Sequence, residues 1–343
     1  MSPLEKFLLF VAAPTVLACA LLEGIVLSRR GGYDWRAFGV SMFDYVLRIV
    51  VTLFLPFSII APLVPWVEAH RLATIKVDDF ASGFALFITL EFFYYWLHRA
   101  GHRVRWFWGN HAVHHTPNQL NLGASLRIGS LGRLIGNAVF LLPMVWLGFD
   151  LRLLVSALTL NLLYQFWIHA TWIPKLGWLE GILNTPSAHR VHHAANLEYL
   201  DGNYGGVLLV FDRLFGTYIP ERDDLPCRYG LVHPMTSYNP LKVEFAQWIS
   251  LARDLASARS PRAVLGYLFM PPGWAPDGPG FTTEALRAAQ GVARPGAAAR
   301  DALPGPASRH GCAVVAARPF ASGRAASAIN APASRARPPA GRH

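Results

Sequence analysis

Histidines whose spacing suits metal binding are concentrated in one part of the sequence. The chain has 343 residues and 13 histidines, and nine of these lie between His98 and His193. They form one H-x-x-x-H motif (His98, His102), two H-x-x-H-H motifs (His111, His114, His115 and His189, His192, His193) and one isolated residue, His169. The remaining four have no histidine at ligand spacing, so we assign no metal to them: His70, His233, His310 and His343.

The spacing of these motifs favours a centre with two metal ions. On a helix, residues three and four positions apart lie on one face, so each motif would direct two or three imidazoles toward a common point. Imidazole is a good ligand for iron, copper, zinc and nickel, and a poor one for magnesium or calcium. Nine ring nitrogens exceed what one ion uses, so we expect two ions, each with about four histidines and an open position. A structural zinc site and a pH sensor are the competing interpretations.

The elements that must position these histidines are strongly apolar. Hydrophobic residues make up 53% of the chain and charged residues 15%, whereas soluble domains carry about a quarter charged residues. Crossing a hydrocarbon core takes about 20 apolar residues. Five tracts reach or approach this length: residues 7–28, 49–66, 80–97, 134–149 and 153–172. The last two predict a tight helical hairpin, so we expect an all-α, multi-pass membrane helical bundle with four to five membrane segments and a cytosolic helical cap.

Arginine and lysine in the short loops indicate the orientation. With the N-terminus outside, the inner loops hold eight of these residues: Arg29, Arg30, Arg36, Arg99, Arg103, Arg105, Arg127 and Arg133. The outer segments hold four: Lys6, Arg71, Lys76 and Arg152. This topology places the histidine motifs on the cytosolic side.

Composition divides the chain into four parts. Residues 1–79 hold N-terminal membrane segments, 80–222 the histidine motifs, and 223–280 a cytosolic or interfacial segment with an amphipathic helix near 242–256. Residues 281–343 are rich in Ala, Arg and Pro and predict a disordered tail. That tail carries +7 of the net charge of +10, so the basicity indicates no nucleic-acid partner. Three distant cysteines exclude a disulfide scaffold and a cysteine-based metal site.

Three stretches of the sequence resemble one enzyme family. They are EFFYYWLHRAGHRVRWFWGNHAVHHTPNQLNLGASLR (91–127), QFWIHATWIPKLGWLEG (165–181) and NTPSAHRVHHAANLEYLDGNYGGVLLVFDRLFGTY (184–218). Together they resemble the fatty acid hydroxylase/sterol desaturase superfamily of membrane di-iron enzymes, in the bacterial branch near alkylglycerol monooxygenase. The resemblance covers about residues 80–218, and residues 229–241 (YGLVHPMTSYNPL) show a weaker similarity.

The resemblance implies which residues bind two iron ions. The eight histidines of the three motifs would be ligands and catalytic residues, with His169 contributing from the intervening segment. This chain departs from the family pattern twice: Glu91 stands where members often have Asp, and Ala188 stands where many have His. The H-x-x-H-H core is intact, so Ala188 puts only an extra histidine in doubt.

Metal-bound histidines need a partner for their second ring nitrogen, normally a carboxylate or a carbonyl. The candidates are Glu91, Asp201, Asn203 and Asp212, of which Glu91 is the strongest because an ionisable group within a membrane segment is costly. An ordinary cap, turn or helix-end role is an open alternative for each of the four. Six aromatic residues either line a lipid route or form an interfacial belt: Trp96, Trp106, Phe107, Trp108, Phe166 and Trp167.

The function implied by the resemblance is lipid oxidation. The enzyme would use O₂ and two electrons to hydroxylate, or desaturate, a C–H bond of a lipid drawn from the bilayer. The sequence shows no haem-attachment, flavin or nicotinamide motif, so we expect a separate redox partner: a ferredoxin or cytochrome reductase system, or tetrahydrobiopterin. The composition of the tail favours a bacterial inner membrane.

Two other function classes remain open. A zinc-dependent membrane hydrolase needs a carboxylate base beside its ligands, but Arg99 and Arg190 occupy the position of the glutamate in H-E-x-x-H. A non-catalytic metal-binding membrane protein or transporter would place polar residues along several spans, whereas these ligands gather at one surface.

Overall fold

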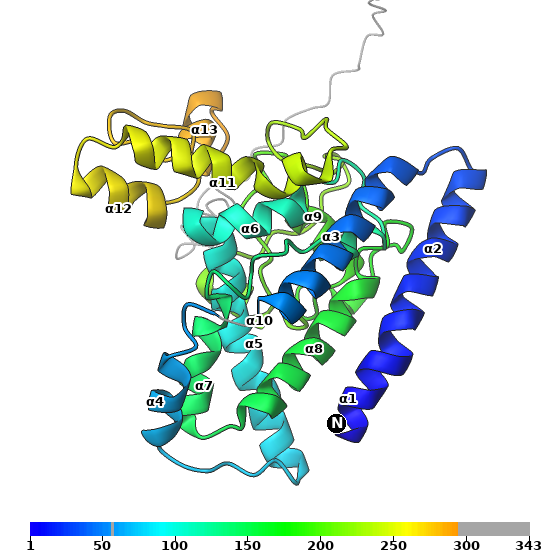
Figure 1. Ribbon diagram of the computed structural model, residues 1–343. Coiled ribbons are helices and arrows are strands. Elements are labelled where there is room, and N and C mark those ends of the chain that lie inside the picture. Colours follow the sequence, from blue (N-terminus) through cyan, green and yellow to red (C-terminus); the bar gives the residue numbers. More distant parts are fainter. Residues whose placement is uncertain (56–57, 294–343) are drawn as a thin grey trace, which may run out of the picture. The chain divides into compact units, whose positions relative to one another are not determined.

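The computed structural model describes residues 1–55 and 58–293, and this part of the chain contains helices and no β-strand. The all-α prediction is therefore confirmed (Figure 1). The α-helices are α1 (Pro3–Phe7), α2 (Ala13–Arg29), α3 (Trp35–Phe54), α4 (Leu63–Ala69), α5 (Phe80–Arg103), α6 (Arg105–His115), α7 (Leu142–Leu147), α8 (Leu151–Trp167), α9 (Pro186–His192), α10 (Val210–Phe215), α11 (Pro240–Ser257), α12 (Pro261–Phe269) and α13 (Thr283–Gln290). The short elements are a π-helical turn η1 (Leu8–Ala12) and the 3₁₀ turns η2 (Ala124–Leu126), η3 (Asn137–Leu141) and η4 (Gly177–Leu179).

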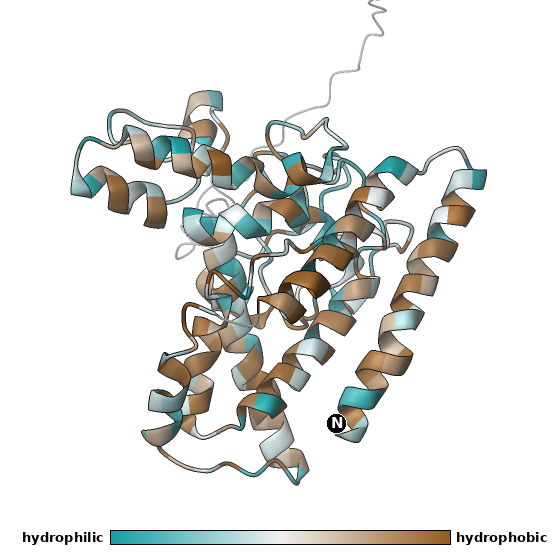
Figure 2. Cartoon of the chain, viewed as in Figure 1, coloured by the Kyte–Doolittle hydropathy of each residue, from teal (hydrophilic) through white to brown (hydrophobic). Residues whose placement is uncertain are grey.

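Three helical segments of the described residues are long and apolar enough to cross a membrane: Pro3–Arg29, Trp35–Phe54 and Phe80–Arg103. They keep large apolar side chains exposed, such as Leu22 and Phe54, at 60% and 76% of their surface. Exposed apolar area on this scale is typical of lipid-facing helices. Figure 2 shows these apolar residues along the long helices, with polar residues gathered toward α6, α9 and α11.

The second membrane segment differs from the tract expected at 49–66. Helix α3 starts at Trp35, where the Asp34 side chain caps it by accepting hydrogen bonds from the backbone N–H groups of Arg36 and Ala37. The tract's second half forms the separate helix α4. Hydropathy missed the first half of α3 because that half carries polar residues, among them Ser41 and Asp44, which the fold buries.

The fourth and fifth apolar tracts form a hairpin beside α5. Helix α7 has six residues and α8 has 17, and Asp150 caps α8 by accepting from Leu153 N at 3.0 Å. Leu90, Met144 and Leu154 lie in one buried core that joins α5, α7 and α8. This core packs against the first half of α5, which precedes the end that carries His98 and His102.

Residues 173–222 form short helices and loops after α8. The amphipathic helix expected near 242–256 is α11, which contacts α6. The tail expected from 281 needs a partial correction: residues 283–290 form α13, and Arg287 donates hydrogen bonds to the backbone oxygens of Leu197 and Leu200 at 2.8 and 2.7 Å. These hydrogen bonds attach α13 to the segment around Leu197 and Leu200, a contact that the composition of the tail does not predict. Residues 294–343 lie outside the described residues.

Candidate metal centre

Four elements bring all nine predicted histidines to one place. Helix α5 supplies two, α6 three and the α9 segment three, while His169 follows the end of α8. Helix α9 is positioned by Thr185, which caps it by accepting from Ala188 N at 3.2 Å, and by Pro186 in its first turn. Eight of the nine histidines are buried and His111 is half-buried.

The histidines separate into two groups. The five-histidine group contains His98, His102, His111, His115 and His192, and the four-histidine group contains His114, His169, His189 and His193. Within each group, the candidate ligand atoms all lie within 4.8 Å of one another. The two groups are adjacent, because the rings of His115 and His193 stack with their centroids 4.4 Å apart.

The spacing of the ring nitrogens fits a metal ion in each group. The Nε2 atom of His111 lies 3.1, 3.0 and 3.3 Å from the Nε2 atoms of His98, His102 and His115. One nitrogen cannot form hydrogen bonds with three others at once. Ligands about 2.1 Å from a shared ion would lie roughly 3.0–3.4 Å apart, which matches these distances.

The four-histidine group has the same spacing. His189 Nε2 lies 3.1 Å from the Nε2 atoms of both His169 and His193. In the neighbouring group, His192 Nε2 is buried without a hydrogen-bond partner. A buried nitrogen without a partner is costly unless it binds an ion, so the residues present fit a metal in both groups.

Backbone oxygens orient four of the imidazole rings. The Nδ1–H groups of His98, His114, His169 and His192 donate to the carbonyls of Tyr204, Arg127, Gln165 and Gly202 at 2.8, 2.7, 2.8 and 3.0 Å. A donated Nδ1 proton leaves the Nε2 lone pair free to bind a metal. Sequence analysis could not identify these partners, because every residue has a carbonyl group.

Burial keeps the histidines neutral at pH 7. It lowers the pKa of His114 to about 4, and the positive charges of Arg127 and Arg48 act in the same direction. Burial also lowers the pKa of His192 to about 4. The pKa values of other ring nitrogens on α6 and the α9 segment are likewise held well below the ordinary value by burial. Neutral imidazole is the form that binds metal ions.

Four residues are candidates to accept a hydrogen bond from the second ring nitrogen of a histidine: Glu91, Asp201, Asn203 and Asp212. None of them hydrogen-bonds to a histidine ring directly. Asp201 comes nearest, with Oδ1 4.0 Å from His102 Nδ1, and it pairs with Arg103 at 2.6 Å. Glu91 accepts from the Asn161 side chain and from Val207 N and Leu208 N.

Asp212 and Asn203 hold the loop formed by residues 201–209, which also contains the two backbone partners of Glu91. Asp212 accepts from Tyr204 N at 2.7 Å and Gly205 N at 2.8 Å, and burial raises its pKa to about 6. Asn203 donates to Ala188 O at 3.0 Å and accepts from Ile219 N at 2.8 Å. These residues therefore hold the loop whose carbonyls orient His98 and His192.

A Gly205→Ala substitution is expected to destabilise this loop. An added Cβ atom would lie 2.0 Å from Leu208 O, so the backbone must shift. We expect a loss of roughly 1–3 kcal/mol in the free energy of unfolding, measured by thermal unfolding in detergent. Gly83→Ala is the matched control, because its Cβ would meet nothing within 4 Å; equal stability of the two variants would contradict the prediction.

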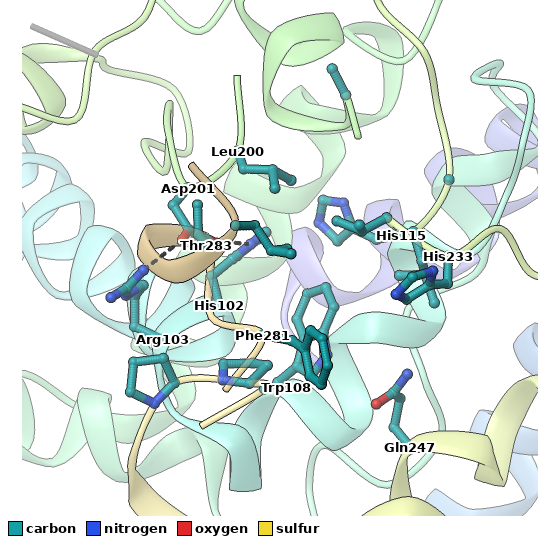
Figure 3. A pocket seen from close by; sticks show the side chains of 18 of the residues that line it. His102, Arg103, Trp108, His115, Leu200, Asp201, His233, Gln247, Phe281 and Thr283 are labelled. Atoms are coloured by element: carbon teal, nitrogen blue, oxygen red, sulfur yellow. Dashed lines mark hydrogen bonds and ion pairs between the residues drawn. The ribbon is translucent and has the colours of Figure 1, made fainter. Parts of the chain in front are cut away.

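Two cavities reach the histidines from different sides. The helix-side cavity, of about 400 Å³, is lined by apolar residues of α2, α5 and α8 and by His98, His111, His114 and His169. The cap-side cavity, of about 250 Å³, is lined by His102, His115, His192, Trp108, Asp201 and Phe281 (Figure 3). The five-histidine group thus borders both cavities, whereas the four-histidine group borders the helix-side cavity.

Two of the six predicted aromatic residues line these cavities, Phe166 and Trp108. The others contact neighbouring side chains or backbone: Trp96 packs on Phe215, Trp106 donates to Ile135 O, Phe107 contacts Phe140 and Trp167 contacts Tyr164.

Comparisons with known proteins agree with this geometry. Residues 83–217 match the model of the fatty acid hydroxylase family. The alkylglycerol monooxygenase of Homo sapiens is 37% identical over 212 residues, covering 62% of this chain and 47% of that protein. The alkylglycerol monooxygenase of Caenorhabditis elegans is 34% identical over 211 residues, covering 57% of this chain and 40% of that protein. An ornithine lipid hydroxylase of Rhizobium tropici is 29% identical over 144 residues, covering 41% and 44% respectively.

The chain spans about half the length of the curated relatives it matches. No solved structure matches the chain significantly. The family match includes all nine clustered histidines, from His98 to His193. The resemblance read from the three sequence stretches is confirmed for residues 83–217, which match the fatty acid hydroxylase family.

Proposed function

We propose that this chain is a membrane-bound di-iron oxidoreductase that hydroxylates, or desaturates, a C–H bond of a lipid. The hydroxylation would consume one O₂, two electrons and two protons, and would yield an alcohol and water. The observation that carries the proposal is the pair of adjacent histidine groups, five and four residues, next to a cavity formed by membrane helices. The names of the relatives, monooxygenases and a hydroxylase of lipids, support the same reaction class.

The nine histidines would hold the two ions, and all nine would be ligands or catalytic residues. When bound, iron supplies the redox chemistry that reduces dioxygen and oxidises an unreactive C–H bond. The chain's own residues fix the imidazoles through the backbone carbonyls and keep the rings neutral through burial. The apolar walls of the helix-side cavity would exclude water and hold the alkyl chain.

A zinc hydrolase fits the site less well. Among the described residues, both groups of possible metal ligands consist of histidines alone and include no carboxylate. Arg190, in place of the glutamate of a metallohydrolase motif, forms a bidentate pair with Glu221 at 2.8 and 2.7 Å. Its guanidinium is engaged by Glu221 and by Ile173 O and offers no base for water activation.

Electrons must come from a separate donor, for which we propose a ferredoxin or cytochrome reductase system, or tetrahydrobiopterin. We further propose that residues 80–222 form the catalytic domain and that the histidines face the cytoplasm of a bacterial inner membrane. The eight inner and four outer arginines and lysines of the short loops support this orientation.

The reaction is tested with membrane lipid, a reductant and ¹⁸O-labelled dioxygen. The intact chain should place labelled oxygen in a lipid, or desaturate it only when O₂ is present, and His114→Ala should lose this activity. His70→Ala is the control, because His70 is exposed and lies outside both groups. Lipid hydrolysis without oxygen would contradict the proposal and favour the zinc enzyme.

A further inference from the structure

The helix-side cavity contains a charged residue that the proposed chemistry does not use. One wall of this cavity comes from α5, α6 and α8, within the family match. The other wall comes from η1, α2 and α3, outside residues 83–217, and includes Tyr45 and Arg48 of α3. Arg48 is the one permanently charged side chain among the residues lining this cavity.

The guanidinium of Arg48 is poorly satisfied by the protein. Its one hydrogen bond among the described residues runs from Nη2 to Leu126 O at 3.5 Å, the limit for such a bond. Within residues 1–55 and 58–293, its Nε is buried without an acceptor, and its one ring contact is with Tyr45, 5.5 Å from the centroid. Arginine has five N–H donors, so most of its donor capacity is unused.

An internal ion pair does not account for Arg48. Asp44, one helical turn earlier, and Glu244 attract the Arg48 guanidinium through their charge, but neither accepts a hydrogen bond from it. Asp44 Oδ2 accepts from Ile128 N and Gly129 N at 2.9 and 3.4 Å, and Asp44 Oδ1 has no hydrogen-bond partner among the described residues. No ion pair within 4.0 Å joins Arg48 to a carboxylate in the described part of the chain. An arginine inside a membrane segment is costly and generally functional. The N–H groups of Arg48 that lack an acceptor in the protein are therefore available to bind a ligand.

Resting on the proposed function, we propose that Arg48 donates hydrogen bonds to an oxygen of the lipid substrate within the helix-side cavity. The substrate class is then an oxygenated amphiphile, and not a plain hydrocarbon chain. A cavity of about 400 Å³ holds a drug-sized molecule, so it admits only a section of a long lipid. Because Arg48 and four histidines border this one cavity, the oxidised carbon lies close to the oxygen that Arg48 binds.

The binding step can be measured without turnover. The full-length protein in detergent, without reductant, would be titrated with radiolabelled hexadecane, methyl palmitate, hexadecyl glyceryl ether and palmitate. Wild type should bind at least one of the three oxygenated lipids roughly tenfold to a hundredfold more tightly than hexadecane, the range for a hydrogen bond to a charged group. Arg48→Met should lose this preference, and Arg48→Lys should keep part of it. The ester and ether distinguish a neutral acceptor from the carboxylate of palmitate.

Leu162→Met is the matched control, because Leu162 lines the same cavity and the change conserves its volume. The proposal is overturned if Arg48→Met weakens hexadecane and the oxygenated lipids equally, or if it changes neither. If Arg48→Met does not fold, Arg48→Gln retains an amide donor and should show a reduced preference; an unchanged preference would also overturn the proposal. Since no turnover is measured, these results are independent of whether the histidine groups catalyse oxidation.

A second readout is the position of the new hydroxyl group in the product. Wild type should oxidise carbons near the polar end of the lipid, and Arg48→Met should spread oxidation along the chain. Oxidation confined to the methyl end in wild type would contradict the placement of the substrate oxygen at Arg48.

Discussion

Replacing His193 with alanine is expected to lower the bound metal from two ions per chain to about one and to reduce lipid oxidation by at least about 100-fold. His193 belongs to the four-histidine group, where its Nε2 lies 3.1 Å from His189 Nε2. Three ligands would remain, and a buried ion with an incomplete shell binds far more weakly. Metal content would be measured by elemental analysis of protein purified in detergent.

The position of His193 makes the loss specific to one group. Its ring stacks on His115 of the neighbouring group, but the five histidines of that group are intact in the variant. His233→Ala is a useful control, since His233 lines the cap-side cavity and belongs to neither group. Full metal content in His193→Ala would refute the assignment of the four-histidine group, and loss of both ions would refute its independence.

Glu91→Ala is expected to destabilise the protein by roughly 3–5 kcal/mol. Glu91 is 1% exposed, and its Oε2 accepts from Val207 N at 2.9 Å and from Leu208 N at 2.7 Å. Its Oε1 accepts from the Asn161 side chain. Alanine would leave these three buried donors without an acceptor, and the 201–209 loop would lose one of its links to α5.

The effect of Glu91→Ala should extend to the metal centre, because this loop supplies the carbonyls that orient His98 and His192. Thermal unfolding and metal content measured on the same samples would test both consequences. Glu68→Ala should change neither quantity, since Glu68 is exposed on α4. A Glu91→Ala protein with wild-type stability and metal content would show that Glu91 does not anchor the loop.

The histidine positions could be predicted from the sequence because helical spacing determines which rings share a face. His98 and His102 lie on one helix, and the two H-x-x-H-H motifs lie on two others. The division into groups could not be predicted, because it cuts across the motifs: His114 joins the four-histidine group, whereas its neighbours His111 and His115 join the other. That division depends on how the helices pack, which local spacing does not contain.

Burial of polar residues explains the remaining differences from the sequence-based expectations. The hydropathy of α3 is reduced by Asp44 and Arg48, whose side chains face the interior of the protein, so the tract predicted from hydropathy begins only at residue 49. The sequence predicts Glu91 and Asp212 as partners of the histidine rings, but both accept hydrogen bonds from backbone N–H groups of the 201–209 loop. Contacts between a side chain and a distant backbone leave no pattern in the sequence.

The backbone carbonyls behind the histidines have an evolutionary consequence. The carbonyls of Arg127, Gln165, Gly202 and Tyr204 accept the Nδ1 protons of four rings. No side-chain replacement at these positions removes an oxygen that belongs to the main chain. The orientation of these imidazoles therefore does not depend on the side chain of the acceptor residue. Positions that fix the path of the backbone carry the constraint instead, such as Gly202 and Gly205, where an added Cβ would lie 2.5 Å from Ile219 Cδ1 and 2.0 Å from Leu208 O.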